Sequence, residues 1–442
     1  MKPSIDKNIV LVNPPLALEG DSLDALGLEI LQTGLRDVGY NNVSILHGDI
    51  DGIRTVDEMI DRIHLLVGEN LDFLGIGILP AVVGFSRELM EKIRSSFSNR
   101  ALEICVGGYF PTSMEEKVFK VFNDSPPDYS VLGPGEQALP EILAHGKNKL
   151  IPNVLTLKDG EILNGGRSML DFSDRPWPSR EKTLNGNTKL AKIVRLVGCP
   201  GNCTFCTIHT YAQDSFQNVP KQRDPVDFVA EMKFLHEKHG IIGFDIVDDE
   251  AIGDNPEDWE LICREIEKNG LKGKVNFSIM ARCESIADNP DIIKMMAEHG
   301  LKFCFCGMES VTERQLKLYK KLRSRTSNVD YQQYLEQIKA SKIILEANGI
   351  LPHFGYIPVD AEVTLEELEK STNLIKELGI LYYTTDLFKR LAIYKGSAIE
   401  TLYRKRDLLL RIENPKDEEW YMQRHNYKYT DPRIEHFKSV YG

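Results

Sequence analysis

AKIVRLVGCPGNCTFCTIHT, residues 191–210, joins an apolar strand pattern at 191–198 to three closely spaced cysteines. These are Cys199, Cys203 and Cys206, in the spacing C-x3-C-x2-C. Pro200 and Gly201 lie between the first two, and proline with its fixed φ beside glycine with its wide freedom lets the backbone turn sharply. The segment therefore predicts a strand that ends in a metal-binding loop.

Downstream of this loop, apolar strand patterns alternate with helical ones. The expected strands are 243–249, 274–282, 302–310, 351–359 and 382–394, and the expected helices are 224–239, 256–269, 290–299, 326–348 and 363–379. Such alternation is typical of parallel strands connected by helices. Six strand-then-helix units predict a partial (β/α)6 barrel over residues 186–400, and active sites of such barrels form at the carboxyl ends of the strands.

Upstream of the loop, the same alternation predicts a second α/β domain over residues 1–145, doubly wound and Rossmann-like. Its expected strands are 8–13, 43–50, 72–79, 102–108 and 128–133. Residues 146–185 read as a linker with a hairpin that turns at Asp159-Gly160, a pair suited to tight hairpin turns. Residues 401–442 are rich in tyrosine without a clear period, and we expect a short C-terminal appendix there.

Charge and composition limit the function. The chain has 54 basic and 66 acidic residues, a net charge of −12, which argues against binding to nucleic acid or to an anionic membrane surface. No segment has the ~20 apolar residues of a membrane span, and the N-terminus has no signal-like apolar core. We expect a cytoplasmic protein with a small-molecule substrate. Its eight cysteines then face reducing conditions, which favour metal binding over disulfides.

The cysteine spacing suits an iron–sulfur cluster. Three thiolates can bind three irons of a 4Fe–4S cubane and leave the fourth iron open for chemistry. The alternatives are a zinc site and buried free cysteines. Zinc usually takes four ligands in paired halves, and no second half follows here; His209 alone is a weak candidate. The position at the end of a predicted strand favours the cluster.

The spacing, with Phe205 before the third cysteine, resembles the signature of radical S-adenosylmethionine (SAM) enzymes. Other segments resemble the subclass that carries an N-terminal cobalamin-binding domain. In the barrel these are IVDDEAI (246–252), ARCESI (281–286), CGMES (306–310) and YKGSAIETLY (394–403). Upstream they are VNPP (12–15), LGLEILQTGL (26–35), VGGYFPTSM (106–114), GPGEQALPEIL (133–143) and DFSDRPWPSR (171–180). The resemblance covers most of the chain.

The resemblance implies roles for single residues. Phe205 would pack near the SAM adenine, and further SAM contacts would come from Asp249, Arg282, Gly307, Glu309 and Ser310. It also implies an external electron donor such as flavodoxin or ferredoxin. The structural alternatives are a core aromatic for Phe205 and salt bridges for Arg282 and Glu309. The glycine-rich motif that the family often has on the fifth strand is incomplete in HFGYIPVDAE (353–362).

The remaining barrel cysteines read as structural. Cys304 and Cys306 share one face of their strand, and Glu309 lies on the other. If Glu309 faces the barrel interior, these two cysteines lie under the helices. Cys263 and Cys283 likewise read as small buried apolar groups.

Cobalamin binding stays open at this stage. The loop VNPPLALEGD (12–21) lacks the histidine of the DxHxxG cobalamin motif, and His47 reads as part of a loop rather than a ligand. The resemblance implies cobalamin contacts at Gly107, Gly108, Gly133 and Gly135, where glycines let backbone approach a flat ring. The alternative is that they serve sharp turns.

These observations favour an enzyme that makes a 5′-deoxyadenosyl radical from SAM and modifies a small molecule, by methyl transfer from cobalamin. Radical dehydration, epimerisation or rearrangement, with the N-terminal domain as a scaffold, is the alternative. An iron–sulfur electron carrier or sensor is a more remote one. A methylthiotransferase is disfavoured because only Cys105 lies in the N-terminal domain. No catalytic side chain can be named.

Overall fold

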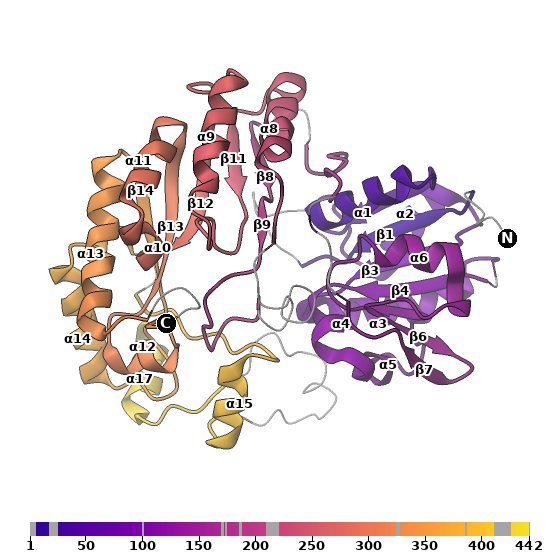
Figure 1. Ribbon diagram of the computed structural model, residues 1–442. Coiled ribbons are helices and arrows are strands. Elements are labelled where there is room, and N and C mark those ends of the chain that lie inside the picture. Colours follow the sequence, from indigo (N-terminus) through magenta and orange to yellow (C-terminus); the bar gives the residue numbers. More distant parts are fainter. Residues whose placement is uncertain are drawn as a thin grey trace. The chain divides into compact units, whose positions relative to one another are not determined.

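The computed structural model describes residues 6–16, 25–99, 101–168, 172, 175–184, 188–208, 221–323, 328–384, 387–410 and 426–441. The described residues form two compact units, one up to residue 184 and one from residue 188 onward (Figure 1). Both units are α/β, as the sequence predicts. Trp420 and Tyr421, in the expected appendix, lie outside the described residues.

The first unit contains one seven-stranded sheet in the order β2-β1-β3-β4-β5-β6-β7. β1 to β5 run parallel, and β6 and β7 are antiparallel additions at the edge. The strands are β1 (Ile9–Asn13), β2 (Val43–His47), β3 (Phe73–Gly77), β4 (Glu103–Gly107), β5 (Tyr129–Val131), β6 (Val154–Lys158) and β7 (Glu161–Asn164).

Helices cover both faces of this sheet, which explains its nearly continuous apolar strands. They are α1 (Leu26–Asp37), α2 (Val56–Val67), α3 (Val83–Ser96), α4 (Tyr109–Met114), α5 (Val118–Val121) and α6 (Ala138–His145), with 3-10 turns at Pro80–Val82, Glu115–Lys117 and Gly146–Asn148. Along β1, Val10 and Val12 join one buried apolar cluster while Ile9 and Leu11 join another. The alternation of side chains along a strand thus builds one core on each face.

The predicted hairpin is present and belongs to this sheet. Asp159 and Gly160 have φ values of 51° and 82°, the positive values that a tight two-residue hairpin turn needs. β6 pairs with β5, so the hairpin extends the first unit instead of standing apart as a linker. The segment after it is fastened to α1, because the buried Glu29 carboxylate accepts hydrogen bonds from the backbone N–H of Lys182 at 2.7 Å and of Thr183 at 3.0 Å.

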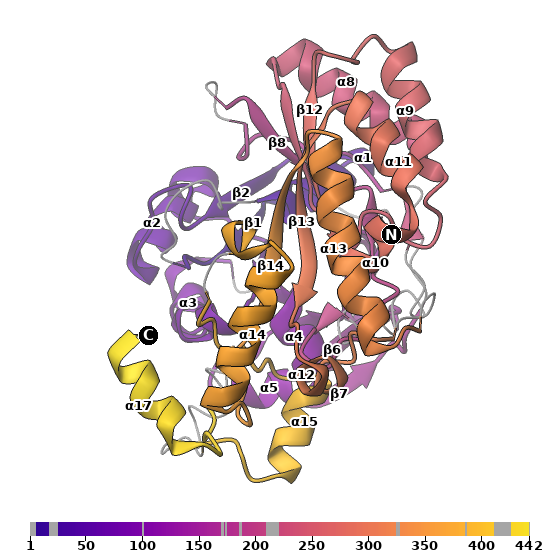
Figure 2. The same cartoon turned by 90° about the vertical axis from the view of Figure 1, so that its left-hand side faces the viewer.

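The second unit contains a five-stranded, fully parallel sheet in the order β14-β13-β12-β11-β8 (Figure 1). Figure 2 shows β14, β13, β12 and β8 of this sheet from the side. Its strands are β8 (Leu190–Ile193), β11 (Gly243–Ile246), β12 (Asn276–Arg282), β13 (Leu301–Glu309) and β14 (Leu351–Tyr356). A second, two-stranded sheet is antiparallel: β9 (Leu196–Val197), which follows β8 in the chain, pairs with β10 (Lys221–Gln222).

The helices of this unit follow the predicted alternation. They are α8 (Pro225–His239), α9 (Asp258–Lys268), α10 (Cys283–Asp288), α11 (Pro290–Glu298), α12 (Glu313–Leu318), α13 (Tyr331–Ala347), α14 (Leu365–Glu377), a 3-10 turn at Leu381–Tyr383, α15 (Ala398–Lys405) and α17 (Pro432–Tyr441). Local signals set the ends of α8: Asp224 caps its N-terminus, Pro225 opens its first turn, and Gly240 ends it with φ of 66°. None of the described helices is long and apolar enough to cross a membrane.

Two predicted strands differ in the structure. The strand expected at 191–198 is interrupted at Arg195, where one carboxylate oxygen of Asp248 accepts the backbone N–H groups of both Arg195 and Leu196. The sixth barrel strand, expected at 382–394, is reduced in the described residues to two isolated parallel bridges, Phe354 with Thr384 and Val359 with Arg390. The barrel is therefore open after its fifth strand.

Arg195 and Asp248 form a buried ion pair under the cysteine loop. The side chains are 2% and 0% exposed, and Arg195 Nε lies 3.0 Å from Asp248 Oδ2.

We predict that Asp248→Asn lowers the free energy of unfolding by about 3–5 kcal/mol, because it leaves the guanidinium charge buried without a counter-charge. Urea denaturation followed by circular dichroism measures this. An exposed pair gives the control, since Glu260→Gln at Arg264 should cost less than about 1 kcal/mol; equal losses at both sites would contradict the prediction.

Candidate functional site

The cysteine loop lies at the carboxyl ends of the second unit's strands, fastened on two sides by Thr204. The Thr204 N–H donates to Tyr319 O at 3.1 Å, and its hydroxyl donates to Leu318 O at 2.7 Å. The Ile399 N–H in turn donates to Thr204 O at 2.9 Å. These bonds link the loop to the end of α12 and to the start of α15. The middle of the loop is therefore held in place by the fold.

Each of the three cysteine sulfurs accepts an N–H donor. Gly201 N lies 3.3 Å from Cys199 Sγ, and Ile208 N lies 3.5 Å from Cys206 Sγ. Cys203 Sγ receives Arg282 Nη1 at 3.5 Å, from the end of β12. All three residues are partly exposed. N–H donors aimed at sulfur favour thiolates that carry metal, because they stabilise negative charge on sulfur.

Gly201 is required for this arrangement. A Cβ atom on this residue would lie 2.4 Å from Arg282 Nη1 and 3.3 Å from Cys199 Sγ. The guanidinium cannot move aside freely, because other hydrogen bonds hold it in a buried position. Glycine therefore lets the loop pass close to both groups, which is a backbone approach that no other residue permits.

Within the described ranges, no group of three or more His, Cys, Asp or Glu side chains is placed to hold one metal ion.

Burial affects the protonation of the thiols. Burial raises the pKa of Cys199 to about 12 and that of Cys206 to about 11. Without metal, both thiols are protonated at neutral pH. A bound metal must displace these protons.

The end of β12 brings a buried charged network to the loop. Arg282 is 6% exposed, and its Nε donates to Glu284 Oε1 at 2.5 Å while its Nη2 donates to Lys321 O at 3.2 Å. The backbone N–H of Arg282 donates to the fully buried carboxylate of Glu250 at 2.9 Å. Burial raises the pKa of Glu250 to about 7. The structure therefore places the Arg282 guanidinium, at the end of β12, against a cysteine sulfur.

The end of β13 has an unusual backbone. Glu309 has a φ of 68°, although it is not glycine, and the pairing with β14 shifts register between Gly307 and Glu309. Its carbonyl accepts the Ile357 N–H at 2.7 Å, and burial raises the pKa of its carboxyl group. Lys321 Nζ donates to Gly307 O at 2.7 Å. Non-glycine residues with positive φ are concentrated at functional sites. Here the positive φ of Glu309 bends the backbone at the end of β13.

Three further residues implied by the resemblance have different surroundings. Asp249 is exposed, accepts the Gly198 N–H at 2.7 Å, and has its pKa raised to about 6 by partial desolvation and by Asp248. Phe205 packs edge-on against Tyr319 with 5.4 Å between ring centroids, beside an apolar cluster. Ser310 is fully buried, and its hydroxyl donates to Gln315 Oε1 at 2.7 Å. The structure thus gives Ser310 a partner within the protein.

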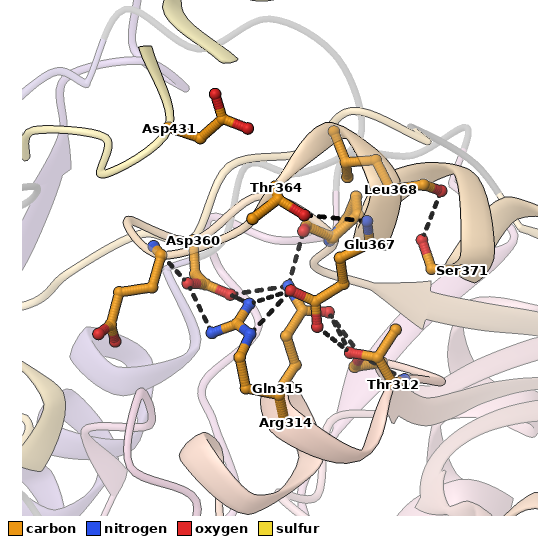
Figure 3. Close-up of polar contacts among 12 residues, drawn as sticks. Thr312, Arg314, Gln315, Asp360, Thr364, Glu367, Leu368, Ser371 and Asp431 are labelled. Atoms are coloured by element: carbon orange, nitrogen blue, oxygen red, sulfur yellow. Dashed lines mark hydrogen bonds and ion pairs between the residues drawn. The ribbon is translucent and has the colours of Figure 1, made fainter. Parts of the chain in front are cut away.

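A polar cluster secures the segment after β14 (Figure 3). Asp360 is fully buried and accepts Arg314 Nη2 at 2.7 Å and Gln315 Nε2 at 2.8 Å. Gln315 Nε2 also donates to Pro358 O at 2.6 Å, and Arg314 Nε donates to Glu367 at 2.7 Å. The cluster joins α12, α14 and the residues after β14. It fixes the backbone in the region where the family's glycine-rich motif is incomplete.

The other cysteines of the second unit are buried, as the sequence predicts. Cys263, Cys283, Cys304 and Cys306 are all 0% exposed. The sulfurs of Cys304 and Cys306 lie 3.9 Å apart on the face of β13 that is turned towards the helices. They belong to the core.

The first unit has the strand order of a ligand-binding crevice. Its parallel strands run 2-1-3-4-5, and in such sheets ligands bind beyond the carboxyl ends near the switch between the first and third strands. Asn13 and Gly77 end these two strands, and a Cβ on Gly77 would lie 2.4 Å from Asn13 Oδ1. His47 ends β2 in a buried position, with its Nδ1 3.4 Å from Ile50 N.

The four glycines singled out in this unit serve different purposes. Gly108 has φ of 94°, and a Cβ there would lie 3.3 Å from Ile78 O. Gly133 has φ of 87° and donates its N–H to Thr112 Oγ1 at 2.9 Å, while Gly135 packs against the side chain of Leu31. Around Gly107, the nearest atom to a Cβ would be 3.8 Å away. A Cβ on Gly107 would therefore make only ordinary van der Waals contact, with Val131 Cβ.

Several residues that shape the site were not predicted. Thr204, Glu250, Glu284, Gln315 and Lys321 all hold strand ends or loops in place. Two of them lie in segments that the sequence marks: Glu250 follows Asp248 and Asp249 in IVDDEAI, and Glu284 is part of ARCESI. Nothing in the local sequence marks the other three.

Comparison with known proteins identifies the second unit. Residues 193–380 match the model of the radical SAM superfamily. The chain is 25% identical over 346 residues to the anaerobic magnesium-protoporphyrin IX monomethyl ester cyclase of Synechocystis, covering 72% of this chain and 64% of that protein. It is 21% identical over 365 residues to the bacteriochlorophyllide d C-8(2)-methyltransferase of Chlorobaculum tepidum, covering 80% and 73%. The chain thus spans slightly less than two thirds of the first relative.

Solved structures show the same fold across both units. The cobalamin-dependent SAM radical enzyme OxsB, with aqua-cobalamin bound, matches with a TM-score of 0.77 at 17% identity, covering 99% of this chain and 66% of that one. The radical SAM methyltransferase TsrM of Kitasatospora setae matches with a TM-score of 0.65 at 18% identity, covering 84% and 71%. Residues 193–380 thus match the radical SAM superfamily, and the chain has the fold of the solved cobalamin-dependent SAM radical enzyme OxsB.

Proposed function

We propose that this protein is a radical SAM enzyme in which Cys199, Cys203 and Cys206 bind three irons of a 4Fe–4S cluster. The observation that carries the proposal is the loop at the strand ends, where each of these sulfurs accepts an N–H donor. A cluster bound there would supply the electron that cleaves SAM to methionine and a 5′-deoxyadenosyl radical. An external one-electron donor of the flavodoxin or ferredoxin class would reduce it in the cytoplasm, where reducing conditions keep cysteines from forming disulfides.

The strand ends around the loop would bind SAM. Glu309 and Asp249 offer carboxylates for its amino group and ribose hydroxyls, and both have pKa values raised by loss of water contact. Gly307, which is partly exposed, would lie beside SAM, and the partly exposed Phe205 ring offers an apolar surface to the adenine. Ser310 would act indirectly, through its bond to Gln315, by ordering the strand end.

The substrate would lie against the exposed face of the second sheet. Phe303 and Phe305 are half-buried there, and the His353 ring lies 5.3 Å from that of Phe305 at 27° between planes. Met280, beside Phe305 on the neighbouring strand, is 40% exposed. A flat, apolar molecule fits such a surface. Two relatives are named for reactions of tetrapyrroles, which agrees with this substrate class.

We propose methyl transfer with cobalamin on the first unit as the reaction. Cobalamin would supply the methyl group and would approach the sheet at Gly107, where a Cβ would meet only Val131 Cβ, at 3.8 Å. The turns at Gly108 and Gly133, however, have structural explanations of their own. This favours, as the second candidate, a radical dehydration, epimerisation or rearrangement in which the first unit is a scaffold.

Binding of SAM to the cluster distinguishes the proposed enzyme from an iron–sulfur electron carrier or sensor. Anaerobically reconstituted protein should hold about four irons per chain and change its electron paramagnetic resonance (EPR) spectrum when SAM is added, because SAM binds the open iron. A carrier or sensor would show the cluster without the SAM-dependent change. That result would refute the enzyme proposal.

Gly201→Ala should disturb the cluster through the loop. The added Cβ would force Arg282 away from Cys203 and press on Cys199. We expect the affinity of the loop for the cluster to fall at least about tenfold, equivalent to 1.4 kcal/mol of binding free energy, which lowers the iron content after reconstitution. Gly27→Ala, where no atom lies within 4 Å of the new Cβ, is the control and should reconstitute normally. Full iron loading in Gly201→Ala would show that the close approach is unimportant.

A further inference from the structure

The guanidinium of Arg282 makes contacts that a SAM-binding arginine would not need. It lies in a buried position at the end of β12 and donates to Cys203 Sγ, to Glu284 and to the Lys321 carbonyl. The Gly201 backbone passes so close that a Cβ would overlap it. Three structural elements thus hold the guanidinium in one orientation, with one edge against sulfur.

The charges around this arginine form a defined set. Lys321 is 2% exposed and donates to Gly307 O, and Glu284 is 4% exposed. Glu284 meets Arg282 through Oε1, while its Oε2 accepts no hydrogen bond from any residue in the described part of the chain. Two cations therefore lie near Cys203 on the protein side of the loop, and the Glu284 carboxylate partly neutralises them together with the buried carboxylates of Glu250 and Glu309.

We propose that Arg282 positions Cys203 and raises the reduction potential of the cluster, in place of the SAM contact that the family resemblance implies. This inference rests on the proposed function, since it concerns the cluster at this loop. Reduction adds one electron, and so one negative charge, to the cluster. A guanidinium bonded to one of its thiolates stabilises the reduced form more than the oxidised form, because the attraction grows with the negative charge.

Glu284 sets the size of this effect. Its carboxylate neutralises part of the guanidinium charge, and arginine stays protonated in either case. Removing the arginine should therefore lower the potential, and removing only the carboxylate charge should raise it. A residue that merely supports the fold would not produce shifts of opposite sign.

The experiment is an EPR-monitored redox titration of the reconstituted holoprotein with dithionite, without SAM. We expect Arg282→Gln to make reduction at least about tenfold less favourable, a fall of about 59 mV for one electron. Glu284→Gln should shift the midpoint upward. Arg223→Gln is the matched control, because Arg223 is also buried and ion-paired, with Glu231 and Asp227, and touches no cysteine; its midpoint should equal that of the unmodified protein.

The outcomes separate this inference from the proposed function. An unmodified protein without a cluster signal refutes the proposed function. A cluster whose midpoint is the same in Arg282→Gln and Glu284→Gln as in the unmodified protein refutes the role of Arg282. If Arg282→Gln does not retain its cluster, the Glu284→Gln midpoint decides, with an upward shift supporting the role and no shift or a downward shift overturning it.

Discussion

Replacement of Cys203 by alanine is expected to abolish reductive SAM cleavage. Cys203 is the middle cysteine of the loop, and its neighbour Thr204 is bonded to Leu318 and Tyr319, which holds this part of the loop in place. A cubane with two protein thiolates would be lost or converted to a smaller cluster. The measurement is 5′-deoxyadenosine formation with dithionite, which should fall to the background without protein.

The control for this variant is a cysteine of the same unit that lies in the core. Cys263→Ala removes a fully buried thiol from α9 and costs some packing energy, but it leaves the loop unchanged. It should keep its iron and its SAM cleavage. Cleavage by Cys203→Ala at the rate of the unmodified protein would remove this cysteine from the cluster. Loss in both variants would point to a general loss of folding, which circular dichroism would reveal.

The sequence predicts the sheets well because their signal is local. Apolar strands such as Ile9–Asn13, between amphipathic helices, read directly as parallel strands covered on both faces. The turn at Asp159-Gly160 is likewise set by two adjacent residues. The pairing of its hairpin with β5 was not predictable, since that depends on an edge far away in the chain.

The site was predictable only where its chemistry is local. Three cysteines within eight residues predict a cluster, whereas the residues that hold the loop in place come from distant positions in the chain. Leu318 and Ile399 bond to Thr204 through their backbones, which carry no residue-specific signal. Arg282 was recognised as a site residue, but its bond to Cys203 depends on a distance between two strand ends that no spacing in the sequence encodes.

The fold also limits how far these glycines indicate cobalamin binding. Gly108, Gly133 and Gly135 match a cobalamin-binding pattern, yet each has a structural reason in a positive φ or in close packing. Such glycines are needed with or without a ligand. A test of cobalamin binding must therefore use a position that the fold itself leaves free.

The products formed from SAM should distinguish methyl transfer from a radical rearrangement. If the first unit binds cobalamin, protein expressed with cobalamin supplied should contain cobalt, without a histidine ligand from this chain, because residues 12–21 contain no histidine. Each methylation should then yield one S-adenosylhomocysteine and one 5′-deoxyadenosine, since one SAM provides the methyl group and another the radical. A radical rearrangement would give 5′-deoxyadenosine without S-adenosylhomocysteine.

Gly107→Leu separates these possibilities within one protein. Its Cβ is accommodated, because the nearest atom is Val131 Cβ at 3.8 Å, and the larger side chain would occupy the position proposed for cobalamin. We expect cobalamin affinity to fall at least about tenfold, or 1.4 kcal/mol, which lowers cobalt content while iron content and 5′-deoxyadenosine formation persist. Ser95→Leu, on the exposed side of α3, places the same side chain elsewhere and should retain cobalt. Cobalt-free protein that still converts its substrate would overturn the methyl-transfer proposal, because the radical alone would then be sufficient for the reaction.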